Sequence, residues 1–204
     1  MTNNRTKYLV MAIFFMAIVI IQVVVPWLGY IPLGAFIVGA APTIIQFTVA
    51  IAAIILGARW GAFMGAFWGL ITLWQAWSTP GTIGSLIFQN PITAIVPRLL
   101  MGFLIGWLFN QLLRGKSARI QVFGLASLGA LAALLNTVGV VLSTAVGFTV
   151  MHTNFTGVPT ENILGWLVSI VAFNGIFEVI TGAILVTIIG KILVPLAENS
   201  GIKG

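Results

Sequence analysis

Six long stretches of the chain are almost purely apolar, and this feature limits the possible folds more than any other. They lie near residues 8–25, 43–57, 61–77, 91–113, 120–148 and 163–190. A helix needs about 20 mostly apolar residues to cross the hydrocarbon core of a bilayer. Each stretch is therefore predicted to span the membrane, although the second and third are short. The expected fold class is an all-α membrane protein, a bundle of six transmembrane helices in one domain over residues 1–204.

The composition excludes a surface that faces water on all sides. Of 204 residues, 60% are hydrophobic and only 6% are charged, whereas soluble domains carry about 25% charged residues. The net charge of +6 comes from single basic residues between apolar runs, not from the clustered basic face that nucleic-acid binding requires. The chain has no cysteine, which excludes disulfides and thiolate metal sites. The expected environment is the lipid bilayer, with no nucleic-acid partner.

The basic residues indicate the orientation in the membrane. If the N-terminus is inside, the inner segments hold Arg5, Lys7, Arg59, Arg114, Lys116, Arg119, Lys191 and Lys203. The remaining basic residue, Arg98, lies within a span, and the outer loops have none. An excess of Lys and Arg is typical of cytoplasmic loops. The sequence therefore predicts a multi-pass protein of the cell membrane with both termini in the cytoplasm.

Polar residues within or at the ends of the spans are the strongest indication of a binding site. They are Gln46, Asn90, Arg98, Asn136, Asn174 and Glu178. Polar side chains are costly inside a bilayer and are usually functional there. Asn174 and Glu178 are four residues apart and share one helix face. We expect these residues to form a pocket that opens outward. The alternatives are a structural ion pair between Arg98 and Glu178, and ordinary interhelical hydrogen bonds for each asparagine.

Glycines recur at every fourth position in the third apolar stretch. The series is Gly57, Gly61, Gly65 and Gly69, and Gly102 and Gly106 repeat the spacing in the fourth stretch. Small residues allow helix backbones to approach closely in a membrane. This spacing predicts tight packing, either within the chain or against a partner membrane protein.

An enzyme is the less favoured hypothesis. The chain has one histidine, His152, and no aspartate, too few ligands for a zinc site. It lacks the GxSxG nucleophile motif and the GxxxxGK[ST] nucleotide-binding loop. We therefore expect no metal, no cofactor and no ATPase activity in this chain, so any pumping requires a partner or an ion gradient. A small intramembrane enzyme that uses Glu178 or His152 remains the alternative.

Several motifs together resemble a known transporter family. They are Ile31-Pro32-Leu33-Gly34, Ile54-Ile55-Leu56-Gly57 with the glycine-rich segment 61–70, Asn90-Pro91, and Pro97-Arg98. This order is similar to the substrate-binding S components of energy-coupling factor vitamin transporters, most of all the pantothenate type. The resemblance covers residues 31–106. Gln46 stands where the pantothenate type has histidine, and Ala12 lacks the second alanine of the family's AxxxA motif.

The resemblance implies a substrate-binding membrane subunit of an ABC importer. Such a subunit works with a transmembrane coupling subunit and two cytoplasmic ATPase subunits, which hydrolyse ATP. Pantothenate is the expected vitamin, and another vitamin is the alternative. Arg98 is expected to bind the carboxylate, Asn90, Asn136, Asn174 and Gln46 to hydrogen-bond the remainder, and Trp77 and Tyr30 to cover the site. Glu178 would orient Arg98 or Asn174, and Gly61, Gly65, Gly69 and Ala12 would pack against the partner.

Overall fold

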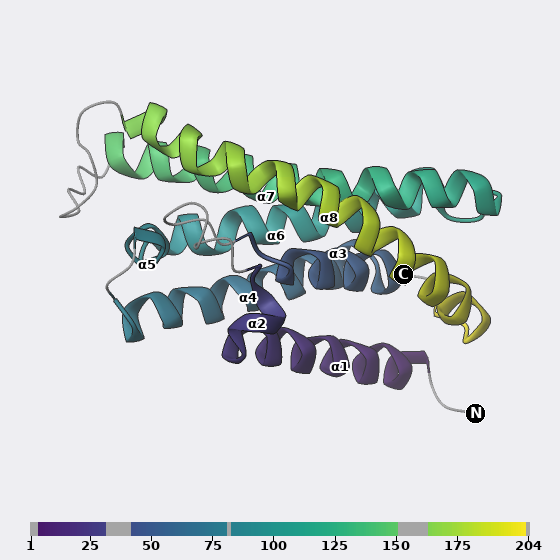
Figure 1. Cartoon of the computed structure of the whole chain (residues 1–204). Helices are drawn as coiled ribbons and strands as arrows, with labels where there is room; N and C mark the ends of the chain where they lie inside the picture. The colour runs from purple at the N-terminus through teal and green to yellow at the C-terminus, as the bar shows by residue number, and fades with distance from the viewer. Residues whose placement is uncertain (1–3, 32–41, 81–82, 151–162, 203–204) are drawn as a thin grey trace.

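Six long helices form the bundle in the computed structural model, which describes residues 4–31, 42–80, 83–150 and 163–202. They are α1 (Asn4–Val24), α3 (Ile45–Leu56), α4 (Ala58–Ser78), α6 (Pro91–Leu108), α7 (Ala118–Val150) and α8 (Ile163–Asn199). Two short helices, α2 (Pro26–Gly29) and α5 (Ile83–Phe88), and a π-helical turn η2 (Phe109–Leu113) complete the described elements. The long helices run side by side along the bundle (Figure 1). The predicted six-helix membrane fold is confirmed.

Each predicted span corresponds to one long helix, but several boundaries differ. The helix α3 has only 12 residues and passes directly into α4 at Gly57, whose positive φ of 94° suits glycine. By length and hydropathy, four described helices qualify as membrane spans: α1, α6 with η2, α7 and α8. The last helix continues well beyond the predicted end near residue 190, because Val194 and Ala197 extend its buried face.

The glycine series joins α4 to α6 inside the chain. A Cβ atom on Gly61 or Gly65 would overlap the backbone of α6, at Gly102 and Arg98 respectively. Gly69 faces Ala94 in the same way, with a Cβ position 2.7 Å from the Ala94 carbonyl oxygen. The assignment of Gly61, Gly65 and Gly69 to a partner surface is therefore corrected, because α6 already occupies that face.

Ala12 requires the same correction. Its side chain is 0% exposed and belongs to the apolar core of the bundle. The exposed face of α1 carries larger apolar residues instead, among them Leu9, Ile13 and Phe14. The exposed face of α1 is therefore made of large apolar side chains, while Ala12 packs inward.

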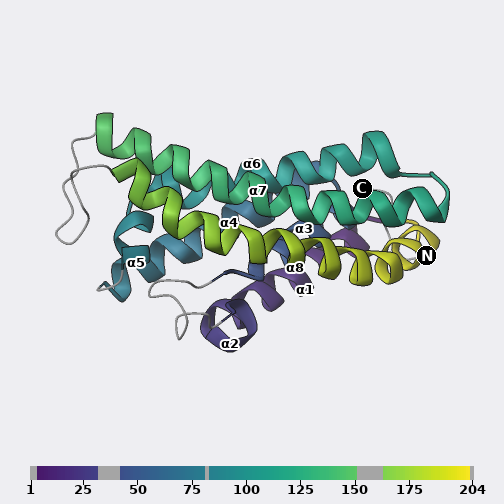
Figure 2. The same ribbon diagram turned by 45° about the horizontal axis from the view of Figure 1, so that its top comes forward.

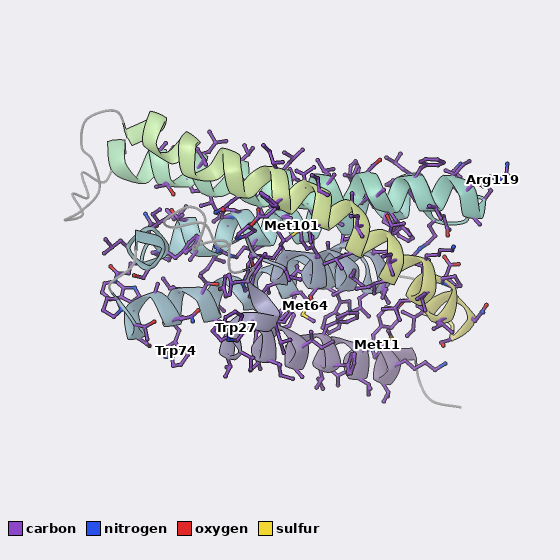
Figure 3. All side chains as sticks on the ribbon, viewed as in Figure 1. Met11, Trp27, Met64, Trp74, Met101 and Arg119 are labelled. Atoms are coloured by element: carbon purple, nitrogen blue, oxygen red, sulfur yellow. The ribbon has the colours of Figure 1, made fainter. Side chains whose placement is uncertain are left out.

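The helices α7 and α8 form a second tight pair, and they lie side by side in both views (Figure 2). Gly129 and Gly182 face each other, and a Cβ atom on either would overlap the backbone of the other. In Figure 3, Met64 and Met101 lie between the helices, whereas Trp27 and Trp74 project outward. Apolar side chains therefore fill the bundle and also cover the surface that faces lipid.

The first turn of α1 and the end of α8 meet at one end of the bundle (Figure 1). Lys7 Nζ donates a hydrogen bond to the Ser200 carbonyl oxygen at 2.8 Å. Arg114, which follows η2, lies at this end as well and donates to the carbonyl oxygen of Ile54 at 3.3 Å. Both ends of the described chain and the α6–α7 connection therefore lie at the same end of the bundle. This arrangement agrees with all three being on one side of the membrane.

Candidate functional site

Arg98 lies at the centre of the candidate site, on α6, with 3% of its surface exposed. Its guanidinium carbon is 4.5 Å from the ring centroid of Trp68 and 4.4 Å from that of Phe88. The Nη1 group donates to the carbonyl oxygens of Thr93, at 3.3 Å, and of Ala94. The Nε–H group has no hydrogen-bond partner within the described residues. The two aromatic rings and the backbone carbonyl oxygens thus stabilise the buried guanidinium cation, and its Nε–H group remains able to donate a hydrogen bond to a ligand.

Local sequence explains how these side chains meet. Gly65 lets α4 approach the backbone of α6 at Arg98, and Trp68, one turn further along α4, points to the same side. Asn90 begins α6, because its side-chain oxygen accepts the Ile92 N–H at 2.9 Å. Close helix packing and a defined helix start therefore place the Arg98 side chain between Trp68 and Phe88.

Glu178 on α8 binds neutral groups and does not pair with Arg98. One carboxylate oxygen accepts the backbone N–H of Thr43 at 2.9 Å, and the other accepts the Thr137 hydroxyl at 3.0 Å. The side-chain amide of Gln46 donates to the carbonyl oxygen of the same Thr43 at 3.1 Å. The alternative of a direct Arg98–Glu178 ion pair is not observed between these two described residues, although each lies within electrostatic range of the other.

Six buried polar atoms on the helices around Arg98 and Glu178 have no hydrogen-bond partner within the described part of the chain. They are Gln46 Oε1, Trp68 Nε1, Thr93 Oγ1, Arg98 Nε, Asn136 Oδ1 and Asn174 Oδ1. An unsatisfied buried polar group costs about 1–3 kcal/mol, so a group of six needs an explanation. A polar ligand that accepts and donates hydrogen bonds at this level of the bundle would satisfy them.

Tyr30 joins the cluster from the segment after α2. It forms an isolated antiparallel bridge with Thr43. Burial raises the pKa of the Tyr30 phenol, and the nearby charge of Arg98 acts in the opposite direction. The phenol is therefore protonated at neutral pH and lies within range of an electrostatic interaction with Arg98.

The structure gives two of the predicted site residues other roles. Trp77 is 65% exposed, and its indole N–H donates to the Gln89 carbonyl oxygen at 3.2 Å. Its assignment as a cover of the site is corrected, because the side chain lies at the outer surface of α4. Asn90 uses its side-chain oxygen to cap α6, two helical turns before Arg98.

His152, which the enzyme hypothesis uses, lies outside the described residues.

Sequence reasoning missed Trp68, Phe88, Thr93 and Thr137. A signal existed for two of them: Trp68 lies on the face of α4 marked by Gly65 and Gly69, and Thr137 follows Asn136. Phe88 lies in the short helix α5 and could not be assigned to Arg98 without the fold. Of the predicted set, Tyr30 lies within electrostatic range of Arg98, and Gln46 and Glu178 both bind Thr43. Asn136 precedes the Thr137 that binds Glu178, and Asn174 lies one turn before Glu178 on α8.

Comparison with known proteins identifies the family. Residues 7–190 match the family model described as "ECF transporter, substrate-specific component". The chain is 69% identical over 204 residues to the pantothenate transporter PanT of Leuconostoc mesenteroides subsp. mesenteroides, covering 100% of both chains. It is 30% identical over 213 residues to the pantothenic acid transporter PanT of Lactococcus lactis subsp. cremoris, covering 97% of this chain and 98% of that one. The chain therefore belongs to the substrate-specific components of ECF transporters, which makes it a multi-pass membrane transport subunit and not an enzyme.

Proposed function

We propose that this chain binds pantothenate and delivers it as the substrate-binding subunit of an ECF-type importer. The observation that carries the proposal is the buried Arg98 guanidinium, which contacts the rings of Trp68 and Phe88 and keeps an Nε–H group without a partner among the described residues. An arginine held in this way suits a carboxylate, because its planar donors match the two carboxylate oxygens. The full-length similarity to two pantothenate transporters supports the same substrate.

Four of the six unpartnered atoms fall into donors on one pair of helices and acceptors on another. Arg98 Nε and Trp68 Nε1 are donors on the α4–α6 pair, whereas Asn136 Oδ1 and Asn174 Oδ1 are acceptors on the α7–α8 pair. Gln46 Oε1 on α3 is a further acceptor. Pantothenate has a carboxylate at one end and two hydroxyl groups at the other, with an amide between. We therefore orient its carboxylate towards Arg98 and Trp68, and its hydroxyl groups towards the two asparagines.

The proposed partners follow from family membership and from the sequence. The chain has no phosphate-binding loop for ATP, so ATP hydrolysis is assigned to two cytoplasmic ATPase subunits. A transmembrane coupling subunit would connect them to this chain. The end of the bundle that holds Lys7, Arg114 and Ser200 is assigned to the cytoplasm, because basic residues concentrate there.

The test is direct binding to the purified subunit. Isothermal titration with pantothenate should show one saturable site per chain, and mass spectrometry of the ligand extracted from the purified protein should detect the same compound. Uptake of radiolabelled pantothenate by cells should require co-expression of the coupling and ATPase subunits. Absence of pantothenate binding, together with retention of a different vitamin, would reject the substrate and leave the family assignment intact.

A further inference from the structure

Two short backbone segments, Gly29–Ile31 and Pro42–Ile44, are tied together and are called the neck below. Ile31 N–H donates to the Pro42 carbonyl oxygen, and Ile44 N–H donates to the Gly29 carbonyl oxygen, both at 2.8 Å. The hydroxyl group of Thr43 also donates to Gly29, at 3.3 Å. Tyr30 sits in the first segment, opposite Thr43. The neck is thus a small backbone unit that carries one side chain of the cluster.

The neck is attached to the bundle through Thr43. Its backbone N–H donates to Glu178 Oε1 at 2.9 Å, and its carbonyl oxygen accepts the Gln46 side-chain amide at 3.1 Å. Glu178 Oε2 is held by Thr137 on α7. Thr43 therefore has both of its backbone polar groups bound by side chains, and Glu178 links the neck to α7 and α8 at once.

Glu178 differs from the other polar residues of the cluster in one respect. Both of its carboxylate oxygens already accept hydrogen bonds from protein donors, whereas Asn136, Asn174 and Arg98 each keep a buried atom without a partner. A second carboxylate that contacted an acidic substrate would also repel it. Arg98 and the two asparagines can therefore bind a ligand through their unpartnered atoms, whereas the hydrogen bonds of Glu178 are already made within the protein.

We propose that Glu178 is a positioning residue that fixes the place of the neck, and with it of Tyr30, relative to α7 and α8, and that it does not contact the substrate. The inference rests on the proposed function for the identity of the ligand, while the attachment of the neck stands on the hydrogen bonds alone. Without Glu178, the neck would sample positions other than the one in which Thr43 is bound to α8. The apparent dissociation constant rises in proportion as the binding-competent fraction falls.

Two measurements test the proposal on the detergent-purified full chain. The first is the distance between spin labels on cysteines introduced at Leu28, in α2 beside the neck, and at Ile176 on α8, both of which are exposed. The second is the affinity for pantothenate by titration. The variants are Glu178→Ala, which removes both acceptors, and Glu178→Gln, which keeps an acceptor for Thr43. Glu198→Ala, near the other end of α8, is the control for the loss of a carboxylate.

Glu178→Ala should broaden the Leu28–Ile176 distance distribution and raise the dissociation constant about tenfold, as expected if about one tenth of the molecules keep a competent neck. Glu178→Gln and Glu198→Ala should keep the narrow distribution and a dissociation constant within about threefold of the parent. Equal loss of affinity in Glu178→Ala and Glu178→Gln with an unchanged distance would overturn the proposal, because the charge itself would then act on the ligand. Unchanged distance and affinity in Glu178→Ala would overturn it as well.

Two further outcomes are covered, one in which Glu178→Ala does not fold and one in which the parent protein does not bind pantothenate. If Glu178→Ala does not fold, Thr137→Val should still broaden the distance, and Thr137→Ser, which restores the hydroxyl group, should narrow it again. Equal distances in these two variants would then reject the linkage. If the parent protein does not bind pantothenate, the proposed substrate fails, but the distance measurement still decides the role of Glu178.

Discussion

Replacing Arg98 by glutamine should weaken pantothenate binding and leave the protein folded. Glutamine keeps a polar amide at this position but removes the charge and the planar set of donors. A hydrogen bond to a charged group contributes about 1.5–3 kcal/mol, which corresponds to an increase of about tenfold to a hundredfold in the dissociation constant. This magnitude applies to the Nε–H group, which has no partner in the described structure and is free for a ligand.

The ring contacts of Arg98 affect stability more than binding. Trp68 and Phe88 contact the guanidinium whether or not a ligand is present, and each such contact contributes about 0.5–2 kcal/mol. Loss of these contacts should lower the melting temperature of Arg98→Gln somewhat. Arg98→Lys keeps the charge but not the planar donors, so its affinity should fall between those of the parent and of Arg98→Gln.

The assay combines two proteins with two ligands. The dissociation constants of pantothenate and of its neutral analogue, in which an alcohol replaces the carboxylate, are measured for the parent and for Arg98→Gln. The substitution should weaken binding of the acid strongly and binding of the alcohol little. The difference between the two losses of binding free energy measures the coupling between Arg98 and the carboxylate. Trp77→Phe, which lies outside the cluster, should change neither constant. Equal losses for both ligands, or no loss for either, would refute the carboxylate assignment.

Three further predictions follow from the packing and the site. Gly65→Ala should destabilise the protein by about 1–3 kcal/mol in thermal unfolding, because its Cβ atom would overlap the Arg98 backbone. Gly175→Ala should cause no destabilisation, because the nearest neighbour of its Cβ atom among the described residues is at 4.0 Å; equal melting temperatures would contradict the packing. Trp68→Phe keeps a ring against Arg98 but removes the indole N–H donor, so it should weaken pantothenate binding, and because Trp68 is fully buried it should also lower the melting temperature. An unchanged dissociation constant would exclude Trp68 from the site. A cysteine at Ser78 should react with an impermeant reagent in intact cells and a cysteine at Ser117 should not, since these exposed positions lie at opposite ends of the bundle; the reverse pattern would invert the orientation.

Much of the fold could be predicted from the sequence, because a bilayer leaves few options for an apolar chain. Long apolar runs become helices in lipid, where every backbone polar group needs an internal partner. The breaks between them were visible as Pro, Gly and charged residues. The short α3 was harder to interpret, because Gly57 joins it to α4 with no loop and the end of one helix is the start of the next.

The candidate site could be predicted only in part. Arg98, Asn136, Asn174 and Glu178 stood out because polar groups are rare within spans, and in the structure three of them keep a buried polar atom without a partner among the described residues. Trp77 was misplaced because position along a helix does not specify which face a side chain uses. Phe88 and Thr43 belong to segments outside the long helices, and no periodicity connects such segments to Arg98 or Glu178.

Glycine packing and ligand chemistry are connected in this fold. Gly61 and Gly65 hold α4 against α6, and Gly129 and Gly182 hold α7 against α8, so each pair behaves as a closely packed unit. The unpartnered N–H groups of Arg98 and Trp68 lie on the first unit, and the unpartnered amide oxygens of Asn136 and Asn174 lie on the second. A ligand with an acidic end and a hydroxyl-bearing end would therefore be bound by both units at once. Occupancy would hold the units together more strongly than the empty site does, so pantothenate should raise the melting temperature of the parent protein. Because this gain requires the bond from Arg98, the rise should be much smaller for Arg98→Gln at the same ligand concentration.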